Sequence, residues 1–547
     1  MSLKIKGVLT HHGFCIKKKQ LKETIQEIKN YFTLTPELNM EEAPKKIKAY
    51  YEDTNYLILP KFFSNETIKI KEVIFNSEKI NKIEFYTTNS FYHHENIEIE
   101  FKGTLRPHQT DIVNAVMKKF NNENEITYGY LLSIYTGGGK TISGTKICSN
   151  LKLKTLVICH TEFLMQQFYE AFENFTNFKS IGYIHQNKFE IDCDIVIASL
   201  QTIISRNYGQ DEFKIFGLVI YDECHHLGSN TFSNILKKTA GIKYSVCLSA
   251  TIDRVDKMDI LLKWYAYGTN VFELRREYVY RVFIKRINFN DTITKTFKEY
   301  NKMFKGRLTP DIIKIKTHLV ENEIRNNMIV ELIQSLKFKG RRIFVFSDRI
   351  KQLEYLKIKI DEFNTLENSA DKYITGLFVA NTRKTEKQNI KQNACIIFIN
   401  YQIGTEGLSI DAMDTLITCS PLKLYKTIIQ CYGRIQRKQG PITDIFKLPL
   451  IIEISDDIPV FKKWELIRDD IYKDENYYVE NHYIKNKELI FYDKLKHEGK
   501  KWTDIVLENI MDENFLIETL FVKDDEKLKT PKNRATKYYE DGENDYF

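Results

Sequence analysis

A run of three glycines followed by lysine and threonine constrains this chain more than any other feature of its sequence. The apolar stretch 130–135 leads into the glycines at 137–139, and Lys140 and Thr141 open a helical stretch over 142–150. Glycines let backbone N–H groups curl around a phosphate, the lysine can reach the outer phosphates, and the threonine hydroxyl can bind Mg²⁺. The segment therefore predicts a strand, a phosphate-binding loop and a helix, in that order. The alternative is a glycine-rich turn with a chance Lys-Thr pair, because the strict motif has a further glycine where Ile134 stands.

A pair of acidic residues follows a second apolar stretch. Asp222 and Glu223 come directly after residues 216–221 and begin 82 residues after Lys140. An acid at the carboxyl end of a parallel strand can supply a second contact to Mg²⁺, and a neighbouring acid can orient an attacking water. The alternative is that the pair only caps the next helix. Together with the glycine loop, the pair predicts a nucleotide-hydrolysing site.

Short apolar runs alternate with amphipathic helical patterns in two parts of the chain, 101–275 and 320–455. This alternation is typical of parallel sheets covered by helices, so we predict an α/β protein with two tandem parallel-sheet domains. Residues 1–100 mix short β-type runs with one helical stretch, which predicts a small α+β accessory domain. Residues 456–547 are expected to form a C-terminal helical accessory region with a mobile, polar tail from about 523.

Composition excludes several classes of protein. With 547 residues, 43% hydrophobic and 28% charged, the chain is neither collagen-like, coiled-coil nor wholly disordered. It has no uncharged apolar run near the roughly 18 residues of a membrane helix and no secretory start, so we expect an intracellular, soluble protein without a membrane partner. Its nine scattered cysteines have no CxxC spacing, which argues against a disulfide framework and a zinc site.

The net charge of +8 is concentrated in one stretch. Residues 275–316 hold twelve basic and four acidic side chains, so the rest of the chain sums to zero. We expect 276–319 to form a basic segment between the two α/β domains. A stripe of this density indicates a nucleic-acid track, and the alternative is a solvated or salt-bridged face.

These segments resemble the motifs of the superfamily 2 helicases, of the DExH kind. Lys140-Thr141 is similar to motif I, and Asp222-Glu223-Cys224-His225 is similar to motif II. Further segments match the remaining motifs in the same order. They are Leu105-Arg106-Pro107-His108-Gln109, Cys159-His160-Thr161-Glu162-Phe163-Leu164 with Gln166, Ala198-Ser199-Leu200-Gln201-Thr202, Ser249-Ala250-Thr251, Phe346-Ser347-Asp348, Gly404-Thr405-Glu406-Gly407-Leu408-Ser409-Ile410-Asp411 and Gln430-Cys431-Tyr432-Gly433-Arg434-Ile435-Gln436-Arg437.

The resemblance implies two RecA-like domains that use ATP and Mg²⁺, and a role for each matching residue. Nucleotide contacts are expected from Arg106, Gln109, Thr136, Gly137, Gly138, Gly139, Lys140, Thr141 and Gly407, and Mg²⁺ contacts from Thr141 and Asp222. Catalysis is expected to use Asp222, Glu223 as general base, Gln430, and Arg434 and Arg437 as arginine fingers. His225, Ser249 and Thr251 are expected to couple hydrolysis to movement, and His160, Thr161, Gln201, Thr202, Ser347 and Thr405 to contact nucleic acid.

The arginine pair has an alternative reading. Arg434 and Arg437 are three residues apart, which is also the spacing of an ordinary pair on a surface helix. Gln430 precedes them at a spacing that puts all three side chains on one helical face, as a shared target requires. We therefore expect one helix to carry all three.

The stretch 249–256, with its Asp-Arg-x-Asp, resembles one subset of the superfamily. That subset includes transcription/repair-factor DNA helicases, a phage branch-migrating helicase, restriction-enzyme motors and the poxvirus transcript-release helicase with its relatives in other large DNA viruses. The amino-acid composition, rich in Lys, Asn, Ile and Tyr, is most similar to that of the viral relatives.

The resemblance as a whole implies an ATP-dependent helicase or translocase. We expect a monomer acting on DNA or RNA, with DNA favoured, together with transcription machinery in transcript release, in the cytoplasm or virion of a large DNA virus. The alternatives are a double-stranded DNA translocase or annealing motor that does not unwind, and a nucleic-acid-binding scaffold with weak ATPase activity.

Overall fold

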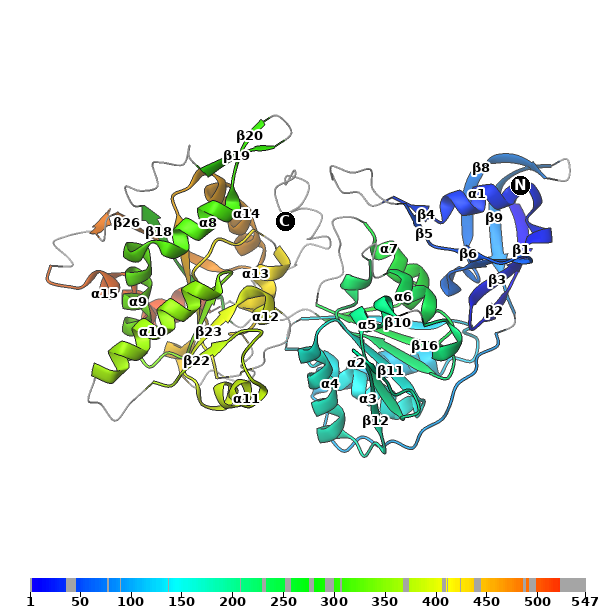
Figure 1. The fold of residues 1–547 in the computed structure, drawn as a ribbon, viewed down its shortest axis with the longest axis horizontal. Helices are drawn as coiled ribbons and strands as arrows, with labels where there is room; N and C mark the ends of the chain where they lie inside the picture. Colours follow the sequence, from blue (N-terminus) through cyan, green and yellow to red (C-terminus); the bar gives the residue numbers. More distant parts are fainter. Residues whose placement is uncertain are drawn as a thin grey trace. The chain divides into compact units, whose positions relative to one another are not determined.

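The computed structural model has two compact units, Met1–Arg276 and Glu277–Lys532 (Figure 1). It describes residues 2–35, 46–75, 78–88, 90–135, 137–206, 208–228, 233–250, 257–274, 280–290, 300–304, 307–366, 373–405, 410, 412–423, 425–436, 444–485, 488–490 and 498–521. The tail expected to be mobile lies outside these residues. In the described part of the chain, no helix is both long enough and apolar enough to cross a membrane.

The first unit is built on an eight-stranded sheet with the strand order β13-β12-β14-β11-β15-β16-β10-β17. Its strands are β10 (Tyr128–Ile134), β11 (Thr155–Cys159), β12 (Ile181–His185), β13 (Lys188–Phe189), β14 (Ile195–Ser199), β15 (Leu218–Tyr221), β16 (Tyr244–Ser249) and β17 (Val271–Leu274). All neighbouring pairs are parallel except β12 with β13. The central strands β11, β14 and β15 are buried along their whole length, because helices cover both faces (Figure 1).

The helices of this unit follow the strands in the alternation expected from the sequence. They are α2 (Pro107–Phe120), α3 (Lys140–Leu151), α4 (Glu162–Phe175), α5 (Leu200–Ser205), α6 (Ser233–Lys238) and α7 (Asp259–Leu262). The predicted parallel-sheet α/β class is therefore confirmed for this part of the chain.

The described part of residues 1–100 forms three small sheets and one α-helix, and the smallest sheet pairs β4 with β5. A three-stranded sheet has the order β1-β9-β8 and a four-stranded sheet the order β2-β3-β7-β6. The elements are β1 (Ser2–Lys6), β2 (Val8–Thr10), β3 (Gly13–Lys17), α1 (Ile25–Tyr31), β4 (Thr33–Leu34), β5 (Ile47–Lys48), β6 (Tyr51–Glu52), β7 (Tyr56–Leu59), β8 (Thr67–Phe75) and β9 (Glu78–Tyr86). This is the α+β composition that the sequence predicts.

This N-terminal region shares a hydrophobic core with the large sheet. Trp264, in the single π-helical turn Lys263–Tyr267, packs against the rings of Phe32 and Phe63, with centroid distances of 5.1 and 5.3 Å. The Tyr265 hydroxyl donates a hydrogen bond of 2.8 Å to the Ala49 carbonyl. Residues 1–100 are therefore an integral layer of the first unit.

A buried lysine lies at this junction and makes a testable contribution to stability. Lys61 is buried, and its Nζ donates to the Ile242 carbonyl at 2.9 Å. Burial lowers the pKa of Lys61 to about 7, so between about pH 7 and pH 10.5 the unfolded chain binds a proton that the folded chain does not. The contribution of this site to stability therefore rises with pH over that range.

We expect Lys61→Met to raise the melting temperature at pH 7.5 by at least about 4 °C, because the variant no longer buries an ionisable amine. The gain should shrink as the pH rises toward 10.5, because the contribution of Lys61 to stability rises over that range. Thermal unfolding followed by circular dichroism at several pH values measures the effect, with the exposed Lys48→Met as the matched control. A gain that is constant with pH would contradict the assignment.

The second unit contains another eight-stranded sheet, with the order β22-β23-β21-β24-β25-β18-β26-β27. Its strands are β18 (Phe283–Asn290), β21 (Ile343–Ser347), β22 (Thr375–Phe378), β23 (Ile396–Asn400), β24 (Thr415–Thr418), β25 (Leu450–Asp456), β26 (Tyr478–Lys485) and β27 (Glu488–Ile490). All neighbouring pairs are parallel except β26 with β27. A second RecA-like sheet is thus present, as predicted.

Helices cover this sheet, and a separate hairpin joins β18 to the first of them. The hairpin is β19 (Asn301–Phe304) with β20 (Arg307–Pro310). The helices are α8 (Ile312–Glu321), α9 (Glu323–Phe338), α10 (Ile350–Leu366), α11 (Lys384–Asn393), α12 (Tyr401–Thr405), α13 (Tyr425–Tyr432), α14 (Pro459–Asp474), α15 (Trp502–Val506) and α16 (Glu513–Leu520). Side chains of α15 and α16 contribute to the core of the unit, so the C-terminal region packs onto this sheet.

The basic stretch differs from its predicted role as an inter-domain segment. Its strand β18 lies inside the second sheet, between β25 and β26. Lys285 and Arg286 are only 0% and 2% exposed. Lys285 pairs with Glu480 at 2.8 Å, and Arg286 pairs with Asp469 at 2.6 Å. These two cations stabilise the sheet and do not face a polymer, because acids almost 200 residues downstream neutralise them.

Candidate active site

The predicted phosphate-binding loop joins β10, near the edge of the first sheet, to α3. Its conformation requires glycine: Gly139 has a φ of +86°, and a Cβ there would lie 2.0 Å from Gln109 Nε2. A Cβ on Gly138 would lie 2.5 Å from Ile134 Cγ2. Ile134, at the position of the strict motif's extra glycine, is the buried last residue of β10, and its carbonyl accepts a hydrogen bond of 3.3 Å from Lys140 Nζ. These glycines have no side chains of their own to cover the backbone, as in loops whose N–H groups bind phosphate oxygens.

The acidic pair follows β15, which lies two strands from β10 in the same sheet, with β16 between them. The backbone N–H of Asp222 donates to the Ile158 carbonyl at 3.0 Å, which holds the acid beside β11. Glu223 has a φ of +43°, an uncommon conformation for a residue with a side chain, of the kind found at functional sites. Its Oε1 lies 3.8 Å from Lys140 Nζ. The fold thus brings together the lysine of the loop and the acid of the second motif.

The electrostatics of this site suit a cation. Burial, followed by repulsion from the Glu223 carboxylate, raises the pKa of Asp222, whereas Lys140 and His160 oppose the shift. Two adjacent acids in a buried setting thus face a single lysine amine. A divalent ion with oxygen ligands would relieve that repulsion, so Asp222 and the glycine cradle fit Mg²⁺ with nucleotide phosphates.

The histidine of the second motif connects the acids to the end of β16. His225 Nδ1 lies 2.9 Å from Ser249 Oγ and 3.3 Å from Glu223 Oε2. The ring of His226 lies 4.3 Å from that of His225 and 4.0 Å from that of His160. His226 is therefore a further site residue that sequence reasoning did not single out, and its only signal was the adjacent His-His pair. Thr251 lies outside the described residues.

The upstream segment contacts the phosphate loop. Arg106 precedes α2, and its backbone N–H donates to Gln109 Oε1 at 2.8 Å. This bond orients the buried Gln109 side chain toward Gly139. His108 Nε2 lies 3.1 Å from the Gly138 carbonyl, a second contact that the sequence did not predict. Thr136 lies outside the described residues.

The four nucleic-acid candidates of the first unit follow the adjacent strands β11 and β14. Gln201 Nε2 donates to the His160 carbonyl at 2.7 Å, which ties the two strand ends together. Thr161 Oγ1 caps α4 by accepting from the Leu164 N–H at 3.3 Å, and Thr202 Oγ1 accepts from the Gln186 N–H at 3.1 Å. Of the four, only the Gln201 side chain is exposed, because His160 and Thr202 are buried and Thr161 is half-buried.

In the second unit, the arginine motif differs from the expected continuous helix. Helix α13 ends at Tyr432, so Gln430 lies on the helix but Arg434 lies in the turn after it. Arg434 is 3% exposed, and its Nε donates to the Gly404 carbonyl at 2.7 Å. Arg437 and Gly407 lie outside the described residues.

The remaining two nucleic-acid candidates come after or at the ends of the neighbouring strands β21 and β23. Thr405 is the last residue of α12. Ser347 is 0% exposed, and its hydroxyl donates to Gln352 Oε1 at 2.7 Å. The Ser347 side chain is thus engaged inside the unit and has no surface to offer a polymer.

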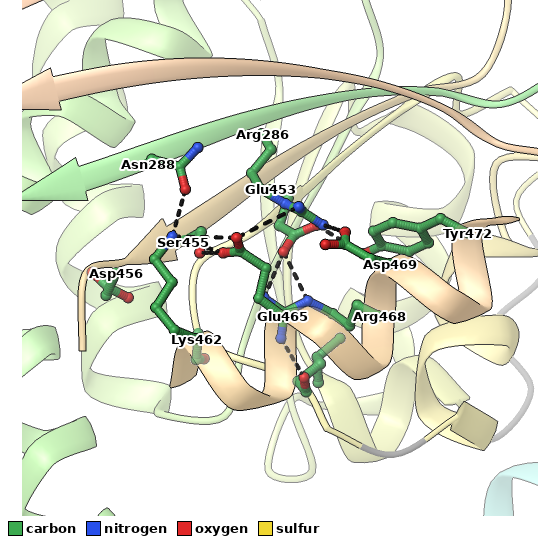
Figure 2. A network of polar contacts seen from close by, with 12 residues as sticks. Arg286, Asn288, Glu453, Ser455, Asp456, Lys462, Glu465, Arg468, Asp469 and Tyr472 are labelled. Carbon is green, nitrogen blue, oxygen red and sulfur yellow. Dashed lines mark hydrogen bonds and ion pairs between the residues drawn. The ribbon is translucent and has the colours of Figure 1, made fainter. Parts of the chain in front are cut away.

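A buried polar network holds the segment that carries Gln430. Figure 2 shows Glu453, on β25, between Arg286 and the α14 residues Arg468 and Tyr472. Arg468 Nε donates to Glu453 Oε1 at 2.7 Å, and the Tyr472 hydroxyl donates to Glu453 Oε2 at 2.8 Å. The two arginines and the tyrosine hydroxyl lower the pKa of Glu453 to about 2, despite its burial.

The same network reaches both ends of α13. Arg468 Nη1 donates to the Leu422 carbonyl, just before the helix, at 2.6 Å. The Tyr472 hydroxyl lies 2.9 Å from that of Tyr432, the last residue of the helix. No local sequence pattern predicted this support, because its members come from separate segments.

Two family models match the chain, each within one of the two units. Residues 102–254 match the res subunit of type III restriction enzymes, and residues 325–439 match the helicase conserved C-terminal domain. A mimivirus protein named as an ATP-dependent RNA helicase, L396, is 28% identical over 86% of this chain and 86% of its own length. The transcript termination protein A18 of Yaba-like disease virus is 24% identical over 70% of this chain and 78% of its own length. The DNA helicase uvsW of phage T4 is 23% identical over 73% of this chain and 76% of its own length.

The fold, the loop and these matches define an ATP-hydrolysing helicase or translocase that acts on nucleic acid. The two matched domains and the helicase relatives, which include proteins of large DNA viruses, bear out the resemblance to the superfamily 2 helicases. The predicted family, fold class and enzyme class are therefore confirmed.

Proposed function

We propose that this enzyme moves along DNA by hydrolysing ATP at Lys140, Thr141, Asp222 and Glu223. The observation that carries the assignment is the approach of Lys140 Nζ to Glu223 Oε1, at 3.8 Å, beside a loop that only glycines can form. A lysine and an acid that are 83 residues apart in the sequence thus lie close together beside the phosphate-binding loop.

The roles follow from the chemistry of each group. Lys140 stabilises charge on the outer phosphates, and the backbone N–H groups of the glycine loop bind phosphate oxygens. Glu223 orients the attacking water and accepts its proton at a carboxylate oxygen. Mg²⁺, held by Asp222 and the Thr141 hydroxyl, would neutralise charge on the phosphate oxygens. Arg106 and Gln109 are assigned to the nucleotide base, since Gln109 lies directly against the loop.

The second unit is assigned the charge-stabilising arginines. Arg434 and Arg437, with Gln430, would stabilise the γ-phosphate during hydrolysis, and Gly407 would contact the nucleotide. The Nε of Arg434 is held by the Gly404 carbonyl, which fixes the direction of its guanidinium. His225, Ser249 and Thr251 are assigned to the coupling of hydrolysis to movement. A change at the acidic motif would be transmitted to the end of β16 through the contact between His225 and Ser249.

The polymer track is assigned to the linked ends of β11 and β14, where Gln201 is exposed, and to Thr405. DNA is proposed as the track, and transcription machinery as a partner in transcript release, because relatives of this chain are named a DNA helicase and a transcript termination protein. Binding through phosphates would be largely independent of sequence and sensitive to salt.

Steady-state ATP hydrolysis tests the proposal. With Mg²⁺ present, we expect single-stranded or duplex DNA to stimulate turnover by about tenfold or more, with RNA less effective and with the stimulation declining steeply as salt rises. Stimulation by duplex DNA without strand displacement would identify a translocase. Rates unchanged by every polymer would contradict the coupling of hydrolysis to nucleic acid, and stronger stimulation by RNA would contradict the choice of DNA.

A further inference from the structure

The three-stranded sheet β1-β9-β8 has one buried and one exposed face. Ile5, Ile68, Ile83 and Phe85 point into the shared core of the first unit. The alternating residues form the outer face, and the strand register places them in rows. The rows are Ser2, Lys82 and Lys69; then Lys4, Glu84 and Thr67; then Lys6 and Tyr86.

This outer face is strongly basic. Lys4, Lys6, Lys69 and Lys82 are all exposed, and Glu84 is the one acid among the eight side chains. Glu84 already accepts a hydrogen bond of 2.7 Å from the Ser2 hydroxyl. Lys69 lies directly opposite Lys82 on the neighbouring strand, a like-charge pairing that destabilises a sheet in isolation. The sheet thus keeps a repulsive arrangement that a bound anion would relieve.

The layout of the lysines indicates which kind of anion fits. The four lysines are spread over three adjacent strands, two on β1, one on β9 and one on β8, so a single phosphate group could not engage them together. A chain of phosphates could, because each lysine acts as a separate point charge. Tyr86 is 41% exposed beside Lys6, and no other large apolar side chain stands in these rows to insert into a membrane.

From these observations we infer that the outer face of the β1-β9-β8 sheet is a second binding surface for the DNA backbone, apart from the ends of β11 and β14. This inference rests on the proposed function. The sheet is joined to the first RecA-like sheet through the core around Trp264, so DNA held here moves as one body with that domain. DNA would therefore stay bound to this surface throughout the cycle of ATP binding and hydrolysis.

A quadruple variant tests the surface: Lys4→Gln, Lys6→Gln, Lys69→Gln and Lys82→Gln in the full chain. Fluorescence anisotropy with a 30-base-pair duplex, repeated over a range of salt concentrations, gives the affinity and its salt dependence. We expect affinity at low salt to fall by about tenfold or more and the slope of log K against log salt to become shallower by about 2 to 4, since each phosphate contact contributes about 0.9. ATP hydrolysis without nucleic acid should remain unchanged.

The control removes the same charge from four exposed lysines on other elements. Lys17→Gln, Lys102→Gln, Lys118→Gln and Lys351→Gln should change the slope by less than about 1 if location, and not net charge, decides the effect. If the quadruple variant and the unmodified protein have equal slopes and DNA still stimulates hydrolysis, the inference of a second DNA-binding surface is wrong. The proposed function would not be affected by that result. Absence of DNA binding and of stimulation in the unmodified protein would overturn both.

Discussion

Lys140→Ala and Glu223→Gln are each expected to reduce ATP hydrolysis by about 100-fold or more, but for different reasons. The alanine removes the amine that lies 3.3 Å from the Ile134 carbonyl beside the glycine cradle, so the phosphates lose their principal charge partner. The glutamine keeps the size of Glu223 but has no carboxylate to accept the proton of the attacking water. ATP binding should therefore be weakened in the first variant and retained in the second.

Two measurements separate these effects. Steady-state hydrolysis at saturating DNA gives turnover, and equilibrium binding of a fluorescent ATP analogue gives affinity. Lys146→Ala is the matched control, because Lys146 lies on the same helix but its amine lies over the Phe101 ring, 5.0 Å from the centroid. Unaltered hydrolysis in both Lys140→Ala and Glu223→Gln would refute the site assignment.

The second large effect is expected at Glu453, in the network of Figure 2. Glu453→Leu would leave Arg286 and Arg468 buried without their shared carboxylate, and we expect the second unit to lose about 3–5 kcal/mol of stability. Glu453→Gln, which keeps the shape but not the charge, should lose less. Because α13 is tied to this network at both ends, DNA-stimulated turnover should fall further than ATP affinity.

Urea unfolding followed by circular dichroism measures the loss, and the exposed Glu354→Gln on α10 is the control. The pKa of Glu453 is lowered to about 2 in the folded protein, so its contribution is fully present above about pH 4.5 and is lost as the pH falls toward 2. The difference between Glu453→Gln and the unmodified protein should shrink over that interval. A loss below about 1 kcal/mol at neutral pH would show that the network does not support the unit.

Much of the candidate site was predictable because its determinants are local. The glycines, Lys140 and Thr141 are consecutive, and their loop geometry needs only the strand before and the helix after. Asp222 and Glu223 could be placed beside them because the carboxyl ends of parallel strands meet at one edge of a sheet. The nearby contacts of His226 and His108 were not predicted, since each depends on a segment remote in the sequence.

The structure differs in part from two other predictions. The basic stretch 275–316 indicated a nucleic-acid track, but two of its twelve cations, Lys285 and Arg286 of β18, are buried against acids from distant segments, namely Glu453, Asp469 and Glu480. The spacing of Gln430 and Arg434 indicated one helix, yet α13 ends between them.

By itself, the sequence predicted the phosphate loop, the acidic pair and the two parallel-sheet domains, because each follows from short-range geometry and from hydrophobic periodicity. The order of the motifs came from the resemblance to the superfamily 2 helicases. Only the tertiary structure decided that residues 1–100 share a core with the first sheet, that β18 lies inside the second, and that one buried glutamate supports both ends of α13. The physical reason is that burial changes what a charged side chain does. From the sequence alone, a lysine or arginine is expected at the surface. It becomes a buried structural residue when folding pairs it with an acid from a distant segment.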